Sequence, residues 1–188
     1  GDQEMAYFAT IGSDKQEGTL PSYTSYFLPE SKLAVMRNNW SENGVSAFLR
    51  GRSGGGHSHA DVNHMSLYAY GRYLLADTGM SSYDQRDPNY QWQFLRTESH
   101  NTVEVNGTGQ QKSGVVNTMM YTNPRVDFYT GESHAYLDFT HTRKVTFPKN
   151  SKFFIVSDFI QAPDNGSVNR FNQTWHNLVE AKPVLNEE

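Results

Sequence analysis

The sequence predicts an all-β protein, an antiparallel β-sandwich of about a dozen strands. Aromatic residues make up 13% of the 188 residues and stand in short runs separated by Asn, Gly, Ser and Pro. Such residues favour strands, and no window repeats apolar residues every three to four positions as an amphipathic helix does. The runs also follow one another at the spacing that is typical of sandwiches and barrels.

The N-terminal stretch differs from the rest in composition. Residues 1–22 are polar and contain the breakers Gly12, Gly18 and Pro21, so we expect an irregular segment or linker remnant there. The β-sandwich domain is expected over residues 23–188. The missing initiator Met and the polar last residues suggest a piece of a larger protein.

The expected strands follow in order, each bounded by turn residues. They cover residues 23–28, 33–40, 45–50, 65–70, 73–77, 103–105, 115–122, 125–130, 135–140, 144–147, 153–159 and 168–175. Only residues 91–98 are expected to hold a helical turn or two.

Gly-containing dipeptides indicate the hairpins. Asn43-Gly44 predicts that strands 33–40 and 45–50 pair, and Asn106-Gly107 predicts a tight turn after strand 103–105, because Asn-Gly tolerates positive φ angles. If Gly71-Arg72 is a two-residue turn, Asp77 lies opposite Ser66.

Composition excludes several classes of function. With 16 Lys and Arg against 20 Asp and Glu the net charge is -4, so no overall positive field draws the chain to nucleic acid or to an anionic membrane. No apolar run approaches the roughly 20 residues of a membrane helix. The chain has no Cys, which rules out disulfides and thiolate metal sites.

Histidines and aspartates suggest a metal site. His57, His59 and Asp61 follow a triple glycine, and in an extended chain they share one face. Asp77 ends an apolar strand, and His100 begins another. Imidazole and carboxylate groups are typical Zn²⁺ ligands, and three of them leave a position for water or substrate.

Three blocks, taken together, resemble the central signature of the heparinase II/III-like polysaccharide lyases. They are HSHADVNH at 57–64, GRYLLADTG at 71–79 and HNTVEVNG at 100–107. The flanking runs agree with the family, so the resemblance covers roughly residues 23–177.

The resemblance implies an activity and a missing partner. Family members join an N-terminal α/α toroid to a C-terminal β-sandwich, and they cleave acidic, uronate-containing polysaccharides by β-elimination. The chain resembles the sandwich only and lacks the toroid, so we expect an incomplete catalytic apparatus and inactivity of this piece alone. The family also implies a periplasmic or secreted protein; heparin, heparan sulfate and alginate stay open as substrates.

The resemblance also assigns roles to residues. His59, Asp77 and His100 match the family's zinc ligands, and His57 matches a histidine that faces the substrate cleft. Tyr83 or Tyr90 corresponds to a cleft tyrosine used in proton transfer. Three arginines flank the motifs and are candidates for holding acidic sugar groups; these are Arg50, Arg52 and Arg96.

Other classes stay open beside the lyase. A cupin-like metal-binding barrel would use His57 and His59, but His64 stands where its Glu belongs. A metallo-β-lactamase-like hydrolase would need its next histidine at position 62. A carbohydrate-binding module would use tryptophans as stacking platforms, here Trp40, Trp92 and Trp175.

Overall fold

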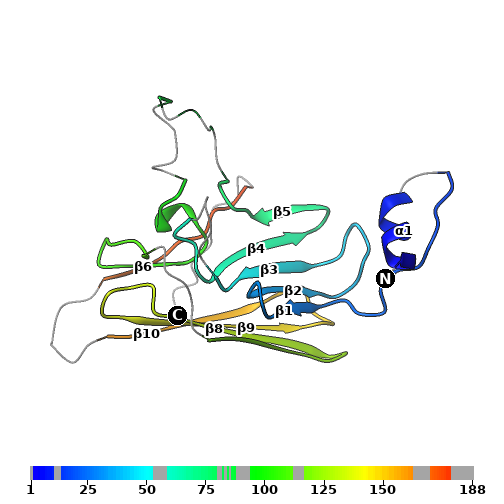
Figure 1. The fold of residues 1–188 in the computed structure, drawn as a ribbon. Helices are drawn as coiled ribbons and strands as arrows, with labels where there is room; N and C mark the ends of the chain where they lie inside the picture. Colours follow the sequence, from blue (N-terminus) through cyan, green and yellow to red (C-terminus); the bar gives the residue numbers. More distant parts are fainter. Residues whose placement is uncertain are drawn as a thin grey trace.

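Two antiparallel sheets lie one above the other and form the predicted sandwich (Figure 1). The structure is a computed structural model and describes residues 2–10, 14–52, 59–79, 82, 84, 86–87, 94–111, 117–162 and 170–178. Eleven strands lie in the described part of the chain, close to the expected dozen.

The first sheet has five strands in the order β1-β2-β3-β4-β5, and every neighbouring pair is antiparallel. Its strands are β1 (Tyr26–Leu28), β2 (Leu33–Arg37), β3 (Ser46–Arg50), β4 (His64–Ala69) and β5 (Arg72–Leu75). Side chains alternate between core and surface with a period of two, and Ala34, Met36 and Leu49 are fully buried.

The second sheet is a four-stranded meander in the order β10-β9-β8-β7. It consists of β7 (Asn117–Thr122), β8 (Val126–Ser133), β9 (Thr140–Pro148) and β10 (Ile155–Gln161). Tyr129, Val145 and Phe147 point from it into the core shared with the first sheet. A separate pair, β6 (Val103–Val105) with β11 (Phe171–Gln173), lies at one end of the sandwich (Figure 1).

The predicted pairing of strands 33–40 and 45–50 is confirmed by β2 and β3. Residues 38–45 form a longer loop, closed by Val45 N–H donating to Asn38 Oδ1 at 2.9 Å. The tight Asn106-Gly107 turn is also confirmed, since both residues have positive φ angles of 55° and 69°.

The predicted turn between β4 and β5 was wrong by one residue. The turn residues are Tyr70 and Gly71, with φ angles of 56° and 73°, because a two-residue turn that matches strand twist needs positive φ at both positions. A register shift after Leu67 then pairs Leu67 with Leu75. Asp77 therefore does not pair with Ser66; it follows the end of β5.

Two further segments differ from expectation. Residues 135–140 do not form a separate strand: residues 134–139 are a loop between β8 and β9, in which the buried Tyr136 hydroxyl donates to Val103 O. At the N-terminus, where the sequence predicted irregular chain, α1 (Asp2–Thr10) forms a helix. Its Phe8 ring packs on Trp40, with 5.2 Å between the two ring centres.

The expected helical turn at residues 91–98 has a counterpart in η1 (Thr97–Ser99), a single 3-10 turn. Within the described ranges, none of the helices has the length and apolar character needed to cross a membrane.

Candidate metal centre

The pairing of the first sheet brings distant parts of the chain to one edge. Because β4 and β5 are antiparallel neighbours, the start of β4 lies beside the end of β5, and this places His64 near Asp77. His59 precedes β4. The turn η1 leads directly into His100, whose backbone N–H donates to Thr97 O at 3.1 Å.

His59, Asp77 and His100 come together here, and we call these three residues the metal centre. One potential ligand atom from each lies within 4.8 Å of the other two. The rings of His59 and His100 are 5.1 Å apart, and His100 Nδ1 lies 3.1 Å from Asp77 Oδ2. The structure thus gathers the three residues that the sequence predicted as zinc ligands.

The surroundings of the metal centre fit a cation. His100 is fully buried, and within the described residues its Nε2 has no hydrogen-bond partner. A buried polar atom without a partner is costly, and coordination to a metal would satisfy it. Two imidazoles and one carboxylate are a donor set that suits zinc.

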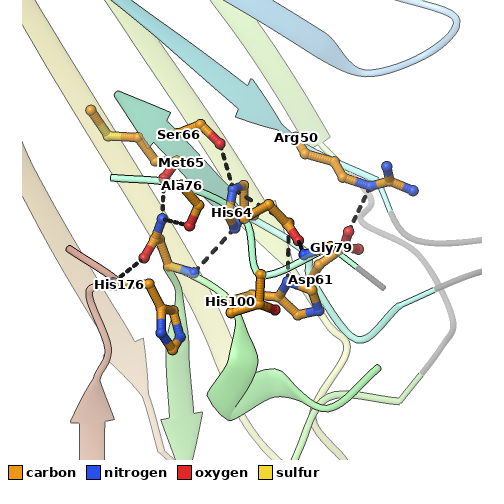
Figure 2. Close-up of polar contacts among 12 residues, drawn as sticks. Arg50, Asp61, His64, Met65, Ser66, Ala76, Gly79, His100 and His176 are labelled. Carbon is orange, nitrogen blue, oxygen red and sulfur yellow. Dashed lines mark hydrogen bonds and ion pairs between the residues drawn. The ribbon is translucent and has the colours of Figure 1, made fainter. Parts of the chain in front are cut away.

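His64 supports the metal centre from the start of β4. It is 2% exposed, and its Nε2 lies 2.8 Å from Ser66 Oγ and 3.5 Å from Asp77 Oδ2. Burial lowers the pKa of His64 to about 3, so the ring is neutral at neutral pH. Its Nδ1 accepts the Asn101 backbone N–H, which leaves the proton on Nε2, the atom that faces the Ser66 hydroxyl (Figure 2).

The pKa values of Asp77 and Asp61 are shifted in opposite directions. Burial alone would raise the pKa of Asp77, but the contact with His100 and the neighbouring His64 outweigh it and hold the pKa well below its ordinary value. Burial raises the pKa of Asp61 to about 6, although Arg50 opposes this shift. Asp77 is therefore a ready ligand anion.

Asp61 does not project with His59 from a strand, as the alternating pattern suggested. Residues 59–63 form turns rather than a strand, and Asp61 is 3% exposed. Its Oδ2 lies 3.0 Å from Arg50 Nε, and its Oδ1 has no hydrogen-bond partner among the described residues.

The three candidate substrate arginines have different surroundings. Arg50 lies beside the metal centre, where Asp61 and the Arg52 carbonyl hold its Nε. The Arg52 side chain is exposed. Arg96 forms an ion pair of 2.8 Å with Glu98 and is 60% exposed. His57, Tyr83 and Tyr90 lie outside the described residues.

Two residues that sequence reasoning left aside belong to this site. His64 was expected to be structural or incidental rather than part of the site, although a histidine that begins an apolar strand is a usable signal for a buried polar role. Asn101 was not singled out, because the contacts of its side chain and backbone N–H come from three separate segments, around residues 64–65, 76 and 176, and no local sequence pattern indicates them.

Comparisons with known proteins agree with this architecture. The family model described as "Heparinase II/III-like, C-terminal" matches residues 21–187. The chain belongs to the heparinase II/III-like family. The family's C-terminal region is the part matched, as the three sequence blocks suggested.

Two curated relatives align with most of this chain. A heparin-sulfate lyase of Bacteroides stercoris is 28% identical over 176 residues, which are 89% of this chain and 25% of the relative. A heparin-sulfate lyase of Bacteroides thetaiotaomicron is 24% identical over 179 residues, again with 89% and 25% coverage. The chain thus spans about a quarter of the length of these curated relatives.

Solved structures show the same fold. The structure named heparinase III, BT4657 gene product, superposes with a TM-score of 0.82 at 24% identity and covers 98% of this chain and 28% of that one. The heparan sulfate lyase HepC from Pedobacter heparinus superposes with a TM-score of 0.77 at 23% identity, covering 86% of this chain and 25% of that one.

Proposed function

We propose that this chain is the C-terminal domain of a polysaccharide lyase that cleaves uronate-containing acidic polysaccharides by β-elimination. It would contribute a zinc site and part of the substrate cleft. The observation that carries the proposal is the convergence of His59, Asp77 and His100 in a chain that matches the family over residues 21–187. The heparin-sulfate lyase relatives favour a glycosaminoglycan over alginate.

The proposed chemistry assigns a task to each group. Removal of the proton beside a uronate carboxylate builds negative charge on that carboxylate, so the site needs cationic or hydrogen-bonding groups there and a base near the proton. Arg50, oriented by Asp61, supplies a cation beside the metal centre. His57 and either Tyr83 or Tyr90 remain the predicted proton-transfer groups.

His59, Asp77 and His100 would hold the zinc ion. When bound, zinc supplies a fixed positive charge that ties three segments of the sandwich together. The neutral His64 binds the Ser66 hydroxyl through Nε2 and lies against Asp77, whose Oδ2 is 3.5 Å from the same nitrogen. The remaining active-site groups would come from an N-terminal toroid domain of the same protein, which we propose to be periplasmic or secreted.

The test compares the parent lyase with this chain alone on heparan sulfate and on alginate. The parent should release unsaturated uronates, read as new ultraviolet absorbance, and this chain alone should not. In the parent, Asp77→Ala should lower the rate at least about 10-fold, whereas His134→Ala, at an exposed histidine paired with Glu132, should not. Cleavage without new absorbance would refute the lyase assignment, and cleavage by this chain alone would refute the shared site.

One observation favours a second candidate, carbohydrate binding by this chain itself. An open groove of about 440 Å³ on the first sheet is lined by Trp40, Phe48, Tyr68 and Tyr73, among others. The Arg37 guanidinium lies 4.0 Å from the Trp40 ring centre, and aromatic and cationic groups suit an acidic sugar. Binding of heparan sulfate oligosaccharides by this chain, abolished in Trp40→Ala, would support it.

Among the described tryptophans, Trp175 does not line this groove. Trp175 packs against the core and lies 5.0 Å from the Arg143 guanidinium, and Trp92 is outside the described residues. The cupin-like alternative loses support as well, because Asp77 and His100 of the metal centre lie outside the segment that resembles a cupin.

A further inference from the structure

Asn101 uses every polar atom it has, at the point where the segments of the metal centre meet. It is fully buried. Its Nδ2 donates to Met65 O at 2.9 Å and to Ala76 O at 3.0 Å, and its Oδ1 accepts the His176 backbone N–H at 2.6 Å. The three partner residues, Met65, Ala76 and His176, are labelled in Figure 2, where dashed lines mark these contacts.

The backbone of Asn101 is held as firmly as its side chain. Its N–H donates to His64 Nδ1 at 3.1 Å, and its carbonyl accepts from Arg143 Nη1 at 2.6 Å. The same Arg143 nitrogen also donates to Asn63 O at 2.7 Å. One asparagine therefore joins β4, the end of β5, the segment after η1 and the C-terminal segment.

We propose that Asn101 is a positioning residue that sets the distance between the Asp77 carboxylate and the His100 imidazole. This inference rests on the proposed function, because it assigns a role within the metal centre. The polar atoms of Asn101 all bind other groups of the protein, so its role is to act through its neighbours.

The covalent neighbours explain the role. Asn101 follows His100 directly, and its amide holds the carbonyl of Ala76, the residue before Asp77. The same residue thus fixes the backbone on both sides of the contact of 3.1 Å between His100 Nδ1 and Asp77 Oδ2. Its backbone N–H also holds the His64 ring, whose Nε2 lies 3.5 Å from Asp77 Oδ2.

Metal affinity depends on such support. Binding groups must be held within about 0.5 Å of their productive geometry, and loss of a group that orients a ligand costs about 10- to 100-fold in metal affinity. Asn101→Asp keeps the shape and the Oδ1 acceptor but removes both N–H donors. The Met65 and Ala76 carbonyls then face a carboxylate and are pushed apart.

The test measures Zn²⁺ affinity of the 188-residue chain by competition with a chromophoric chelator, and ligand geometry by the visible absorption of bound Co²⁺. Asn101→Asp and Asn101→Ala should each bind Zn²⁺ about 10- to 100-fold more weakly and alter the Co²⁺ spectrum. Electrostatics alone predicts the opposite for Asn101→Asp, because an added negative charge attracts a cation.

Ser25→Ala is the matched control. Ser25 is also buried, and its Oγ donates to Asp127 at 2.5 Å and accepts from Arg37 N–H at 2.9 Å. It lies at the opposite end of the sheet, since Arg37 pairs with Ser46 and Ser46 with Tyr68 at the far end of β4 from His64. This variant should lower Tm and leave Zn²⁺ affinity unchanged.

The outcomes separate the two proposals. Unchanged affinity in either folded Asn101 variant, or an equal loss in Ser25→Ala, would overturn the positioning role while the metal centre stands. A wild-type chain that binds no Zn²⁺ would overturn the metal centre itself and this role with it.

Discussion

Replacing Arg143 by Met should destabilise the sandwich more than most single substitutions. Arg143 is fully buried in β9, and its Nε and Nη2 bind the Asp158 carboxylate at 2.8 and 2.9 Å. Its Nη1 donates to the carbonyls of Asn63 and Asn101. The substitution therefore leaves a largely buried carboxylate without its guanidinium partner.

The magnitude follows from the burial of the pair. Side-chain exposure is 0% for Arg143 and 9% for Asp158, and removal of one partner from a buried ion pair costs about 3–5 kcal/mol. A domain of this size loses about 2–4 °C of Tm per kcal/mol, so Arg143→Met should lower Tm by about 6–20 °C.

The assay is thermal unfolding by circular dichroism, with a matched control and a double variant. Arg86→Met, at an exposed pair with Asp84, should leave Tm unchanged. Arg143→Met combined with Asp158→Leu should recover part of the loss, because an apolar pair leaves no unpaired buried charge. A Tm loss in Arg143→Met no larger than in Arg86→Met would refute this account of the buried pair.

Three further predictions concern metal, pH and packing. The purified chain should hold about one tightly bound zinc, lost in His59→Ala and in His100→Ala, as measured by atomic emission. Burial alone would raise the pKa of Asp158, but its hydrogen-bonding partners, Arg143 first, hold the pKa well below its ordinary 3.8. This group therefore contributes stability above that value, and the contribution is lost as the pH falls from 3.8 toward the lower folded-state pKa; urea unfolding at successive pH values should show the loss in the wild type and not in Asp158→Asn. Gly131→Ala should destabilise the chain by about 1–3 kcal/mol, read by urea unfolding, because the added Cβ would lie 2.5 Å from the Tyr129 hydroxyl.

A control or a refuting outcome can be named for each of the three predictions. His134→Ala should keep the zinc; retention of zinc by either ligand variant would count against the metal centre. An Asp158→Asn chain with the wild-type acid profile would show that other groups govern acid unfolding. A Gly131→Ala chain of wild-type stability would mean that the Tyr129 and Asn63 side chains can shift away from the added methyl group at little cost.

Much of the fold could be predicted from local signals. The Asn106-Gly107 turn and the pairing of β2 with β3 follow from dipeptides that need particular backbone angles. Residues 135–140 were wrongly predicted as a strand, because Ala135 and Tyr136 are buried in a loop. Their apolar character reflects burial and not strand geometry. Helix α1 has only nine residues and no clear helical period of apolar residues, and so it was not predicted.

Only part of the site could be predicted from local sequence signals. His59, Asp77 and His100 could be named from blocks of sequence, and the structure brings their ligand atoms within 4.8 Å of one another. Asn101 could not be named, because its partners are 25 to 75 residues away. The roles of His57, Tyr83 and Tyr90 remain predictions.

Buried Arg143 binds groups that are far away in sequence, and this has a consequence for the order of folding. Arg143 and the Asn63 carbonyl are 80 residues apart in sequence. Asn101 Oδ1 accepts the backbone N–H of His176, which is 75 residues downstream. Contacts of such long separation form late, because loop closure must be overcome before they stabilise the chain. We therefore expect the proposed zinc site to form only after β9 and the C-terminal segment have left the ribosome, so that metal binding would stabilise a sandwich that has already formed.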